Sequence, residues 1–521
     1  MPAQKSDLTV SSPRNLAGWL AALIAAGIPV AAAADDAALA ARAYREANDA
    51  RILTDFGEFL KLPNVASNLA DMAANADWIE AYLGQRGFET RRWEAGGAPY
   101  VYGERRVAGA AKTLLIYAHF DGQPVAPEEW ASPPWTPTLR TDLVVNGGEV
   151  VPWKRVQTAI DPRWRVFARS AGDDKAPVIA LAAAVDALDA AGIEPSVNIK
   201  VILDGEEEAG SPTLDRILSA HADDLQADLM LFCDGPMHQS RRRQLVFGVR
   251  GSMTVDLTAY GAQRPLHSGH YGNWAPNPND TLIRLLAGMK DGQGRITIPG
   301  YGDAVRPITP AEQAAIDAMP RIEAGLAKEL GLGRTEGGGD RLETLVMRPA
   351  IVVKGLSGGG VGADSSNVIR PSATASLNLR LVPDQTPDTI RPVLEKYFAE
   401  QGFHIVHADP DRDTLLAHER VLKVDWRPGA YRGFRSDLDS AEARRLVDVL
   451  DGIGGEPTLL TPTMGGSLPI YLFETALDLP IVLLPVANHD NNQHGRNENL
   501  RLQNLWDAIE VYAAVLANYG R

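Results

Sequence analysis

The chain of 521 residues contains a single cysteine, Cys233, so no intrachain disulfide can form. A Cys-x-x-Cys zinc site and a thiol redox pair are excluded for the same reason. Any metal ion bound by this protein must therefore be held by His, Asp and Glu side chains.

The sequence also lacks an excess of positive charge. It has 51 Lys and Arg residues against 66 Asp and Glu, a formal net charge of −15, and an isoelectric point near 5.2. Phosphate backbones are bound by basic surfaces, so this charge argues against nucleic acid as a partner. The Gly-rich stretch 355–362 has no GxxxxGK motif and therefore gives no phosphate-binding loop.

Long apolar runs are scarce, and only residues 16–30 (LAGWLAALIAAGIPV) approach the length of a membrane span. Lys5 and Arg14 precede this run, and small residues follow it as far as Ala34. That order is typical of a secretory signal peptide, so we expect cleavage after Ala34 and a secreted or periplasmic protein. An uncleaved N-terminal membrane anchor and a buried Ala-rich helix are the alternatives. We expect no other membrane partner.

Over most of the chain, apolar runs of strand type alternate with segments of helical spacing. The strand-type runs are 112–119, 197–203, 227–234 and 479–486, and the helical segments are 36–51, 72–85 and 178–191. This alternation predicts an α/β fold with a mostly parallel central sheet flanked by helices.

Between about residues 252 and 428 the pattern changes to alternating strands, which are typical of sheets with one exposed face. Strands are predicted at 253–261, 373–382 and 403–408, and helices at 280–289 and 387–401. Because 521 residues exceed what one hydrophobic core accommodates, we predict that 252–428 is a smaller α+β domain inserted into the main one.

Polar side chains gather where the predicted strands end. The segments are HFDG (119–122), RSAGDDK (169–175), EEE (206–208), Asp234, and QHGRNENL (493–500) with His494 and Glu498. Each has an ordinary explanation by itself, such as a helix cap at Asp173 or Asp174 or a solvated acidic turn. Together they supply two His and several carboxylates at the edge where open α/β sheets bind ligands. That donor set suits a pair of divalent ions.

These residues resemble the di-zinc exopeptidases, the family of carnosinase, glutamate carboxypeptidase, aminoacylase and succinyl-diaminopimelate desuccinylase. The resemblance covers the chain from about residue 50 onward and is closest to the carnosinase-like dipeptidase branch. The motifs that carry it are AHFDGQP, WASPPWTPTLR, RSAGDDK, DGEEEAGS, LHSGHYG, LRLVPDQ and QHGRNENL. It implies a zinc-dependent hydrolase that cleaves the amide bond of dipeptides or short peptides with a free C-terminal carboxylate.

The resemblance also implies a domain plan. Residues 35–251 and 429–521 would form a catalytic domain, and 252–428 an inserted lid or dimerisation domain. Two divalent ions would be bound per chain, most often zinc, with manganese or cobalt as alternatives. Their ligands would be His119 and Asp234 for one ion, Glu208 and His494 for the other, and Asp173 as the bridge between them.

Two further carboxylates receive roles from the resemblance. Asp121 would orient His119 through its second ring nitrogen. Glu207 would be the general base, because its neighbour Glu208 is committed to the metal while Glu207 stays free to exchange protons.

Substrate recognition would come mainly from the inserted domain. By the same resemblance, Arg380 would grip the substrate carboxylate, Asn367 would make a polar contact, and Gly466 with Ser467 would complete the carboxylate pocket. His267 would reach the active site of a partner subunit and stabilise the oxyanion, which implies a homodimer formed through the inserted domain.

The chain departs from the family pattern in three places. DGEEEAGS replaces EGxEESGS and leaves the base and ligand positions intact, whereas QHGRNE replaces AHSQNE and leaves His489 as a second candidate ligand. Where carnosinase-like proteins have a pocket histidine, this chain reads DWRPGAYRG (425–433), with Tyr431 and Arg432 as possible replacements.

Two other functions remain open from the sequence. A deacylase acting on N-acyl amino acids would use the same chemistry on another substrate. A non-catalytic binding protein of the same fold is the third reading, which the complete set of ligands and base disfavours.

Overall fold

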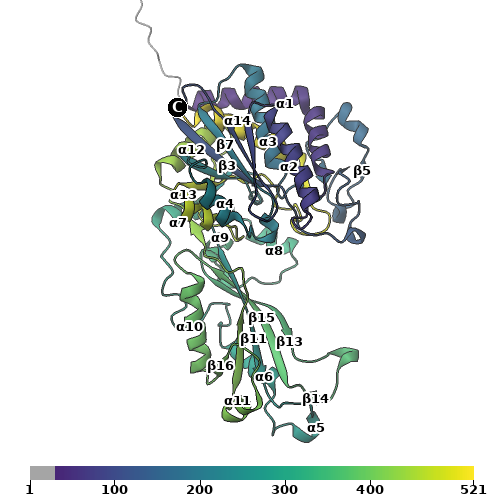
Figure 1. Ribbon diagram of the computed structural model, residues 1–521, viewed down its shortest axis with the longest axis vertical. Helices are drawn as coiled ribbons and strands as arrows, with labels where there is room; N and C mark the ends of the chain where they lie inside the picture. Colours follow the sequence, from purple (N-terminus) through teal and green to yellow (C-terminus); the bar gives the residue numbers. More distant parts are fainter. Residues whose placement is uncertain (1–29) are drawn as a thin grey trace, which may run out of the picture.

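The computed structural model describes residues 30–521, and Figure 1 shows two domains arranged along the long axis of the molecule. Most of the predicted signal peptide, residues 1–29, lies outside the described residues. Residues 30–34 form the first turn of helix α1 (Val30–Leu60), in which Ala34 is buried. Within residues 30–521, no helix has both the length and the apolarity that crossing a bilayer requires.

The first domain is built on an eight-stranded mixed sheet in the order β1-β2-β7-β3-β8-β20-β9-β19. Its central strands β7, β3, β8 and β20 are mutually parallel, and β1 and β2 are antiparallel at one edge. The predicted α/β class with a mostly parallel sheet is therefore confirmed. The strands are β1 (Glu89–Trp93), β2 (Tyr100–Arg105), β3 (Lys112–His119), β7 (Val197–Asp204), β8 (Leu229–Phe232), β9 (Gln244–Val246), β19 (Leu459–Thr461) and β20 (Ile481–Leu483).

Helices cover both faces of this sheet. Both sides of each central strand are therefore buried, which is why the strand sequences are unbroken apolar runs. In β3, Leu114 and Ile116 enter the core under helices α1, α3 and α14, whereas Leu115 and Tyr117 enter the core under α4 and α13. The helices of the first face are α1, α3 (Ala176–Ala191), α12 (Ala441–Asp451) and α14 (Leu502–Asn518), and those of the second are α4 (Leu214–His221) and α13 (Ile470–Leu477). Helix α2 (Leu69–Gly84) packs beside β1 and β2.

The second domain contains a five-stranded sheet in the order β13-β15-β11-β17-β16 (Figure 1). Successive residues of β15 alternate between buried and half-buried, as the sequence pattern predicts for a sheet with one covered face. Helices α6 (Pro278–Ala287) and α10 (Pro387–Glu400) cover that face. The strands are β11 (Gly251–Tyr260), β13 (Ala350–Ser357), β15 (Ser372–Leu381), β16 (His404–Val406) and β17 (Val421–Trp426).

The middle of the predicted insertion returns to the first domain. Helices α7 (Pro310–Ala318), α8 (Glu323–Glu329) and α9 (Leu342–Val346) lie above the second sheet in Figure 1, and α7 contacts β19. Glu312 of α7 forms a buried ion pair with Arg435, at 2.9 Å. Arg250 donates hydrogen bonds to the main-chain carbonyls at the end of α9. The segment from α7 to α9 is called the return segment below.

Candidate metal centre

Loops at the ends of three parallel strands bring the predicted ligands together. His119 is the last residue of β3 and is opposite Asp204, the last residue of β7, so the HFDG and EEE loops leave the sheet side by side. Asp234 follows β8, which pairs with β3 on its other side. The chemistry therefore collects at the carboxyl ends of the strands, as expected for an open α/β sheet.

The other two ligands come from a small antiparallel sheet in the order β21-β6-β4-β5. Asp173 follows β6 (Arg165–Phe167), and His494 precedes β21 (Asn499–Arg501), which pairs with β6. The remaining strands are β4 (Thr138–Arg140) and β5 (Val150–Val151). Pairing of β6 with β21 is what carries His494, from the end of the chain, to Asp173.

The five predicted ligands form two groups that share one member. His119, Asp173 and Asp234 offer ligand atoms within 4.8 Å of one another, and so do Asp173, Glu208 and His494. His119 Nε2 lies 2.8 Å from Asp173 Oδ1, and His494 Nε2 lies 3.2 Å from Asp173 Oδ2. Asp173 thus presents one oxygen to each group, which is the arrangement expected of a bridging carboxylate.

The electrostatics of the two groups fit divalent cations. Asp173 Oδ2, Glu208 Oε1 and Asp234 Oδ2 are buried and accept no hydrogen bond in the structure. Burial, together with the neighbouring Asp173 carboxylate, raises the pKa of Asp234 to about 7 and that of Glu208 to about 8. Crowded carboxylates that accept no hydrogen bond are stabilised most by positive charge placed between them. The donor set of two His and three carboxylates, with no thiolate, suits two zinc ions or similar divalent metals.

Asp121 connects the first metal group to the backbone of Glu207 and Glu208. Its Oδ1 lies 3.2 Å from His119 Nδ1, so Nε2 is left facing Asp173. The same carboxylate accepts hydrogen bonds from the backbone N–H groups of Glu207 and Glu208, each at 3.0 Å. One buried side chain therefore sets the orientation of a ligand and the position of the adjacent glutamates.

Glu207 lies beside the metal groups without belonging to either. Burial and the charges of Asp234 and Glu208 raise the pKa of Glu207 well above its usual value, against the opposing effect of His119. A carboxylate that is not committed to a metal and is next to one that is committed suits proton transfer.

Glu498 has a role that sequence reasoning did not assign. Its fully buried carboxylate accepts hydrogen bonds from Arg169 Nη1 at 2.7 Å and from the backbone N–H groups of Ser170, Gly172 and Asp173 at 3.0, 3.1 and 3.1 Å. It therefore holds the loop that carries Asp173, the predicted bridging ligand. Its position four residues after His494, in the motif QHGRNENL, is the signal that the sequence gives.

Glu206 is also more than the residue that precedes the site. Its buried carboxylate accepts hydrogen bonds from Tyr100 OH at 3.0 Å, from the backbone N–H of Ala98 at 3.1 Å, and from the backbone N–H of Thr213 at 2.8 Å. These contacts tie the loop of Glu207 to β2 and to the start of α4. The sequence of the run does not distinguish Glu206, whose role is structural, from Glu207 and Glu208.

Two of the predicted substrate residues meet across the domain boundary. Arg380 of β15 donates from Nη1 to Ser467 Oγ of the first domain at 2.7 Å. The carbonyl of Gly466 accepts a hydrogen bond from the backbone N–H of Arg250 at 3.1 Å, which fixes the main chain beside Ser467.

His267 and Asn367 lie elsewhere. His267 is exposed in the short strand β12 (Leu266–His267), which pairs with β14 (Val368–Ile369) directly after Asn367. The labels of β14 and the adjacent α5 (Ser268–Tyr271) mark the far end of the second domain in Figure 1. Within one chain, these two residues are therefore not brought to the metal groups. His489, the alternative ligand, belongs to neither group among the described residues.

Comparison with known proteins decides the family. A model of the peptidase family M20/M25/M40 matches residues 115–518, which is most of the chain. The chain belongs to this peptidase family. It is therefore a metallopeptidase, and the predicted resemblance to carnosinase-like enzymes is confirmed at the level of the family.

Relatives within the M20/M25/M40 family include dipeptidases. The Cys-Gly metallodipeptidase of Schizosaccharomyces pombe is 26% identical over 421 residues, covering 80% of this chain and 81% of the relative. The Beta-Ala-His dipeptidase of Mus musculus is 26% identical over 412 residues, covering 77% and 76%. The M20 family metallo-carboxypeptidase of Sulfolobus solfataricus matches with a TM-score of 0.71 and 26% identity, covering 90% of this chain and 99% of that one.

Proposed function

We propose that this M20 peptidase hydrolyses dipeptides or short peptides that end in a free carboxylate. The observation that carries the proposal is the sharing of Asp173 between two ligand groups, with the uncommitted Glu207 beside them. The names of the curated relatives, which are dipeptidases, support the substrate class.

His119, Asp173, Asp234, Glu208 and His494 would hold two divalent ions, most often zinc, with manganese or cobalt as alternatives. When bound, such ions polarise the scissile carbonyl and lower the pKa of the attacking water. Glu207 takes a proton from that water and delivers it to the leaving amine. Asp121 keeps both His119 and the Glu207 loop in place during this exchange, because it bonds to both.

Arg380 and Ser467 form the site proposed for the substrate carboxylate. Arg380 carries a planar fork of donors that suits a carboxylate, and it already reaches a hydroxyl of the opposite domain. Because the recognition site spans both domains, a short substrate would be held between the metal groups and β15.

A homodimer through the second domain is part of the proposal. Strand β13 is at the edge of its sheet and exposes Val352, Val353 and Leu356, with 47%, 45% and 55% of their surface accessible. An edge strand with exposed apolar side chains favours pairing with another strand. A second copy docked there would allow His267, which is remote from its own site, to serve the site of the partner. We also propose a secreted or periplasmic location, which the sequence pattern of residues 1–34 supports.

The general base is tested by Glu207→Gln in the metal-loaded protein. Metal content should stay near two ions per chain, while turnover falls by about 10²-fold or more, the usual contribution of a positioned base. Glu128→Gln, at an exposed position, is the matched control and should behave like wild type. Turnover of Glu207→Gln near the wild-type rate would contradict the assigned role.

A substrate panel tests the reaction class. It contains Cys-Gly, β-Ala-His and Ala-Ala beside N-acetylalanine and N-succinyl amino acids, each assayed after loading with zinc, manganese or cobalt. Hydrolysis of the dipeptides supports the proposal. Hydrolysis of the N-acyl amino acids alone would make the enzyme a deacylase, and no hydrolysis with no bound metal would leave only a binding function.

A further inference from the structure

The connection between helices α1 and α2, residues 61–68, contains a buried asparagine. Asn64 is 0% exposed although it belongs to neither helix. It lies outside residues 115–518, the range that the family model matches, and outside the motifs that resemble the di-zinc exopeptidases. A buried amide must find its hydrogen-bond partners within the protein. The role of Asn64 therefore follows from the groups to which it is bonded.

Asn64 is hydrogen-bonded to two loops that carry predicted metal ligands. Its Nδ2 donates to the carbonyl of Phe120 at 2.7 Å, and its main-chain carbonyl accepts from the N–H of Gly122 at 2.8 Å, both in the HFDG loop. Nδ2 also donates to Ser170 Oγ at 2.8 Å, in the RSAGDDK loop. One residue from outside the central sheet therefore joins the two loops.

The orientation of the Asn64 amide is set by its partners. Its Oδ1 accepts a hydrogen bond from Trp135 Nε1 at 3.2 Å, and an indole nitrogen can only donate. Its Nδ2 faces the carbonyl of Phe120, which can only accept. Because both ends of the amide face partners of fixed polarity, a flipped side chain would leave buried groups without hydrogen bonds.

Ser170 extends this chain of hydrogen bonds to Asp121. Its hydroxyl accepts from Asn64 and donates its one hydrogen to the main-chain carbonyl of Asp121 at 3.2 Å. The φ angle of Ser170 is +62°, a conformation that persists in a non-glycine residue only where the surroundings hold it. Asn64 holds Ser170 through its hydroxyl, and Glu498 holds it through its backbone N–H.

The two loops approach each other closely at Gly122. A Cβ at Gly122 would lie 2.3 Å from Ser170 Oγ and 3.0 Å from Cδ of Arg169, so a side chain there would push the loops apart. The same two loops carry His119 and Asp173, whose Nε2 and Oδ1 atoms are 2.8 Å apart. The distance between these two ligand atoms therefore depends on how closely the loops approach.

A second contact fastens the α1–α2 connection to the RSAGDDK loop. Lys175 is fully buried, and its Nζ donates to the carbonyls of Phe59 and Leu62 at 2.9 and 3.0 Å. The helical partner of the Phe59 carbonyl would be residue 63, which is a proline without an N–H group. Lys175 thus fixes the chain directly before Asn64, so that Asn64 reaches both loops from a fixed support.

We propose that Asn64 is a positioning residue of the metal centre. It keeps the loop of His119 at the distance from the loop of Asp173 that binding of a divalent ion requires. The inference rests on the metal ligands of the proposed function and is independent of the substrate.

The test titrates metal-free wild type and Asn64→Ala with zinc against a competing chelator. The alanine removes the side-chain hydrogen bonds that join the loops, so zinc affinity should fall about tenfold, the lower end of the effect of residues that support metal ligands. Zinc should also raise the melting temperature of Asn64→Ala by less than it raises that of wild type, because stabilisation by a ligand depends on its affinity.

Ser170→Ala is the second, milder variant. It removes the hydroxyl that links Asn64 to Asp121 and keeps the contact of Asn64 with Phe120, so it should also weaken zinc binding. The double variant should bind zinc about as weakly as Asn64→Ala alone, because both changes break the same connection.

Asn518→Ala is the matched control for Asn64→Ala. Asn518 is equally buried, and its Nδ2 also donates to two main-chain carbonyls. Leu516, two residues earlier, accepts a hydrogen bond from Ser196 directly before β7, so Asn518 lies at the edge of the sheet opposite the metal groups. This variant should lower the melting temperature with and without zinc equally and leave zinc affinity unchanged.

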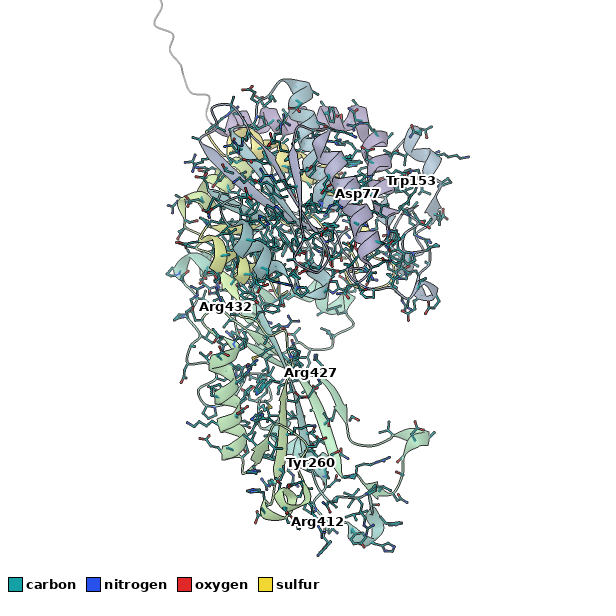
Figure 2. The ribbon with its side chains drawn as sticks, in the orientation of Figure 1. Asp77, Trp153, Tyr260, Arg412, Arg427 and Arg432 are labelled. Atoms are coloured by element: carbon teal, nitrogen blue, oxygen red, sulfur yellow. The ribbon has the colours of Figure 1, made fainter. Side chains whose placement is uncertain are left out.

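Tyr260→Phe is the control for the loss of a hydroxyl in Ser170→Ala. The phenol of Tyr260 donates to Asp409 at 2.7 Å, and Figure 2 labels Tyr260 in the second domain, away from the metal groups. Its zinc affinity should equal that of wild type.

Wild-type zinc affinity in both Asn64→Ala and Ser170→Ala would overturn the inference. So would a melting temperature of Asn64→Ala that falls by the same amount with and without zinc, since that is the result of a purely structural role. Asp173→Ala tests the ligand set separately. If Asp173→Ala binds zinc like wild type, the proposed ligands are wrong; if it loses zinc while Asn64→Ala keeps it, only the positioning role fails.

Discussion

Replacing Glu498 by glutamine should destabilise the first domain and loosen the loop of Asp173, the proposed bridging ligand. The carboxylate is fully buried, and its strongest partner is Arg169, of which only 2% is exposed. Glutamine leaves that guanidinium without a counter-charge and turns an amide N–H₂ toward donors. The remaining amide oxygen cannot accept all of the hydrogen bonds that Glu498 receives.

The expected loss is about 3–5 kcal/mol of unfolding free energy, the usual effect of removing one member of a buried ion pair. Urea unfolding of the metal-loaded protein, followed by tryptophan fluorescence and circular dichroism, measures this loss in the transition of the first domain. Metal affinity should fall in parallel, because the backbone N–H of Asp173 is bonded to Glu498. Glu149→Gln, at an exposed position, is the control and should change stability by less than about 0.5 kcal/mol.

A double variant tests whether the unpaired charge of Arg169 causes the loss of stability. Arg169→Met combined with Glu498→Gln removes both charges, so it should be less destabilised than the sum of the two single variants. A loss below about 1 kcal/mol in Glu498→Gln with two metals still bound, against the 3–5 kcal/mol expected of a buried pair, would refute the role of Glu498 as the support of the Asp173 loop.

The remaining predictions concern the residue that supports His119 and the proposed dimer. Asp121→Asn should lower metal affinity about 10- to 100-fold, because it weakens the contact that orients His119, and titration of the metal-free protein with zinc measures this. A zinc affinity of Asp121→Asn equal to that of wild type would show that Asp121 does not support the metal centre. Leu356→Lys places a charge on the exposed edge strand β13 and should give monomers in light scattering, together with loss of activity if His267 acts on the partner's site. A variant that stays dimeric would place the interface elsewhere.

The central sheet could be predicted from sequence because its strands are buried on both faces. In β3, alternate residues enter two different cores, so nearly every position is apolar and the run from 112 to 119 has clear ends. The predicted helix at 36–51 was correct in type but short, because α1 extends over 31 residues. The Ala-rich sequence of its first turn is equally typical of the end of a signal peptide.

The candidate metal groups could be predicted because each member lies at the end of a strand or in a loop that follows or precedes one, and has a side chain that binds metals. The supporting contacts could not, because they depend on how distant loops close on one another. Glu206 and Glu207 are adjacent and identical in type, yet one is hydrogen-bonded to Tyr100 and the other lies beside the metal groups. Similarly, Tyr431 and Arg432 are adjacent, yet the backbone of Tyr431 pairs with Ser252 of β11, and the side chain of Arg432 contacts Glu474 and Thr475 of α13.

The return segment was not predicted either, since its helices are short and bounded by glycine and proline. Their placement depends on two arginines, one at each of the two crossings where the second domain begins and ends. Arg250, just before β11, holds α9, and Arg435 in β18 (Phe434–Arg435) holds α7.

This anchoring limits how the two domains can move. A domain joined only by two neighbouring chain crossings can rotate about them as about a single axis. Here the return segment ties the second domain to the first at a further place, and both arginines that fasten it belong to the crossings themselves. A large rotation would have to break the Glu312–Arg435 pair and the carbonyl contacts of Arg250 together. The two domains are therefore expected to keep nearly the same relative orientation when a substrate binds.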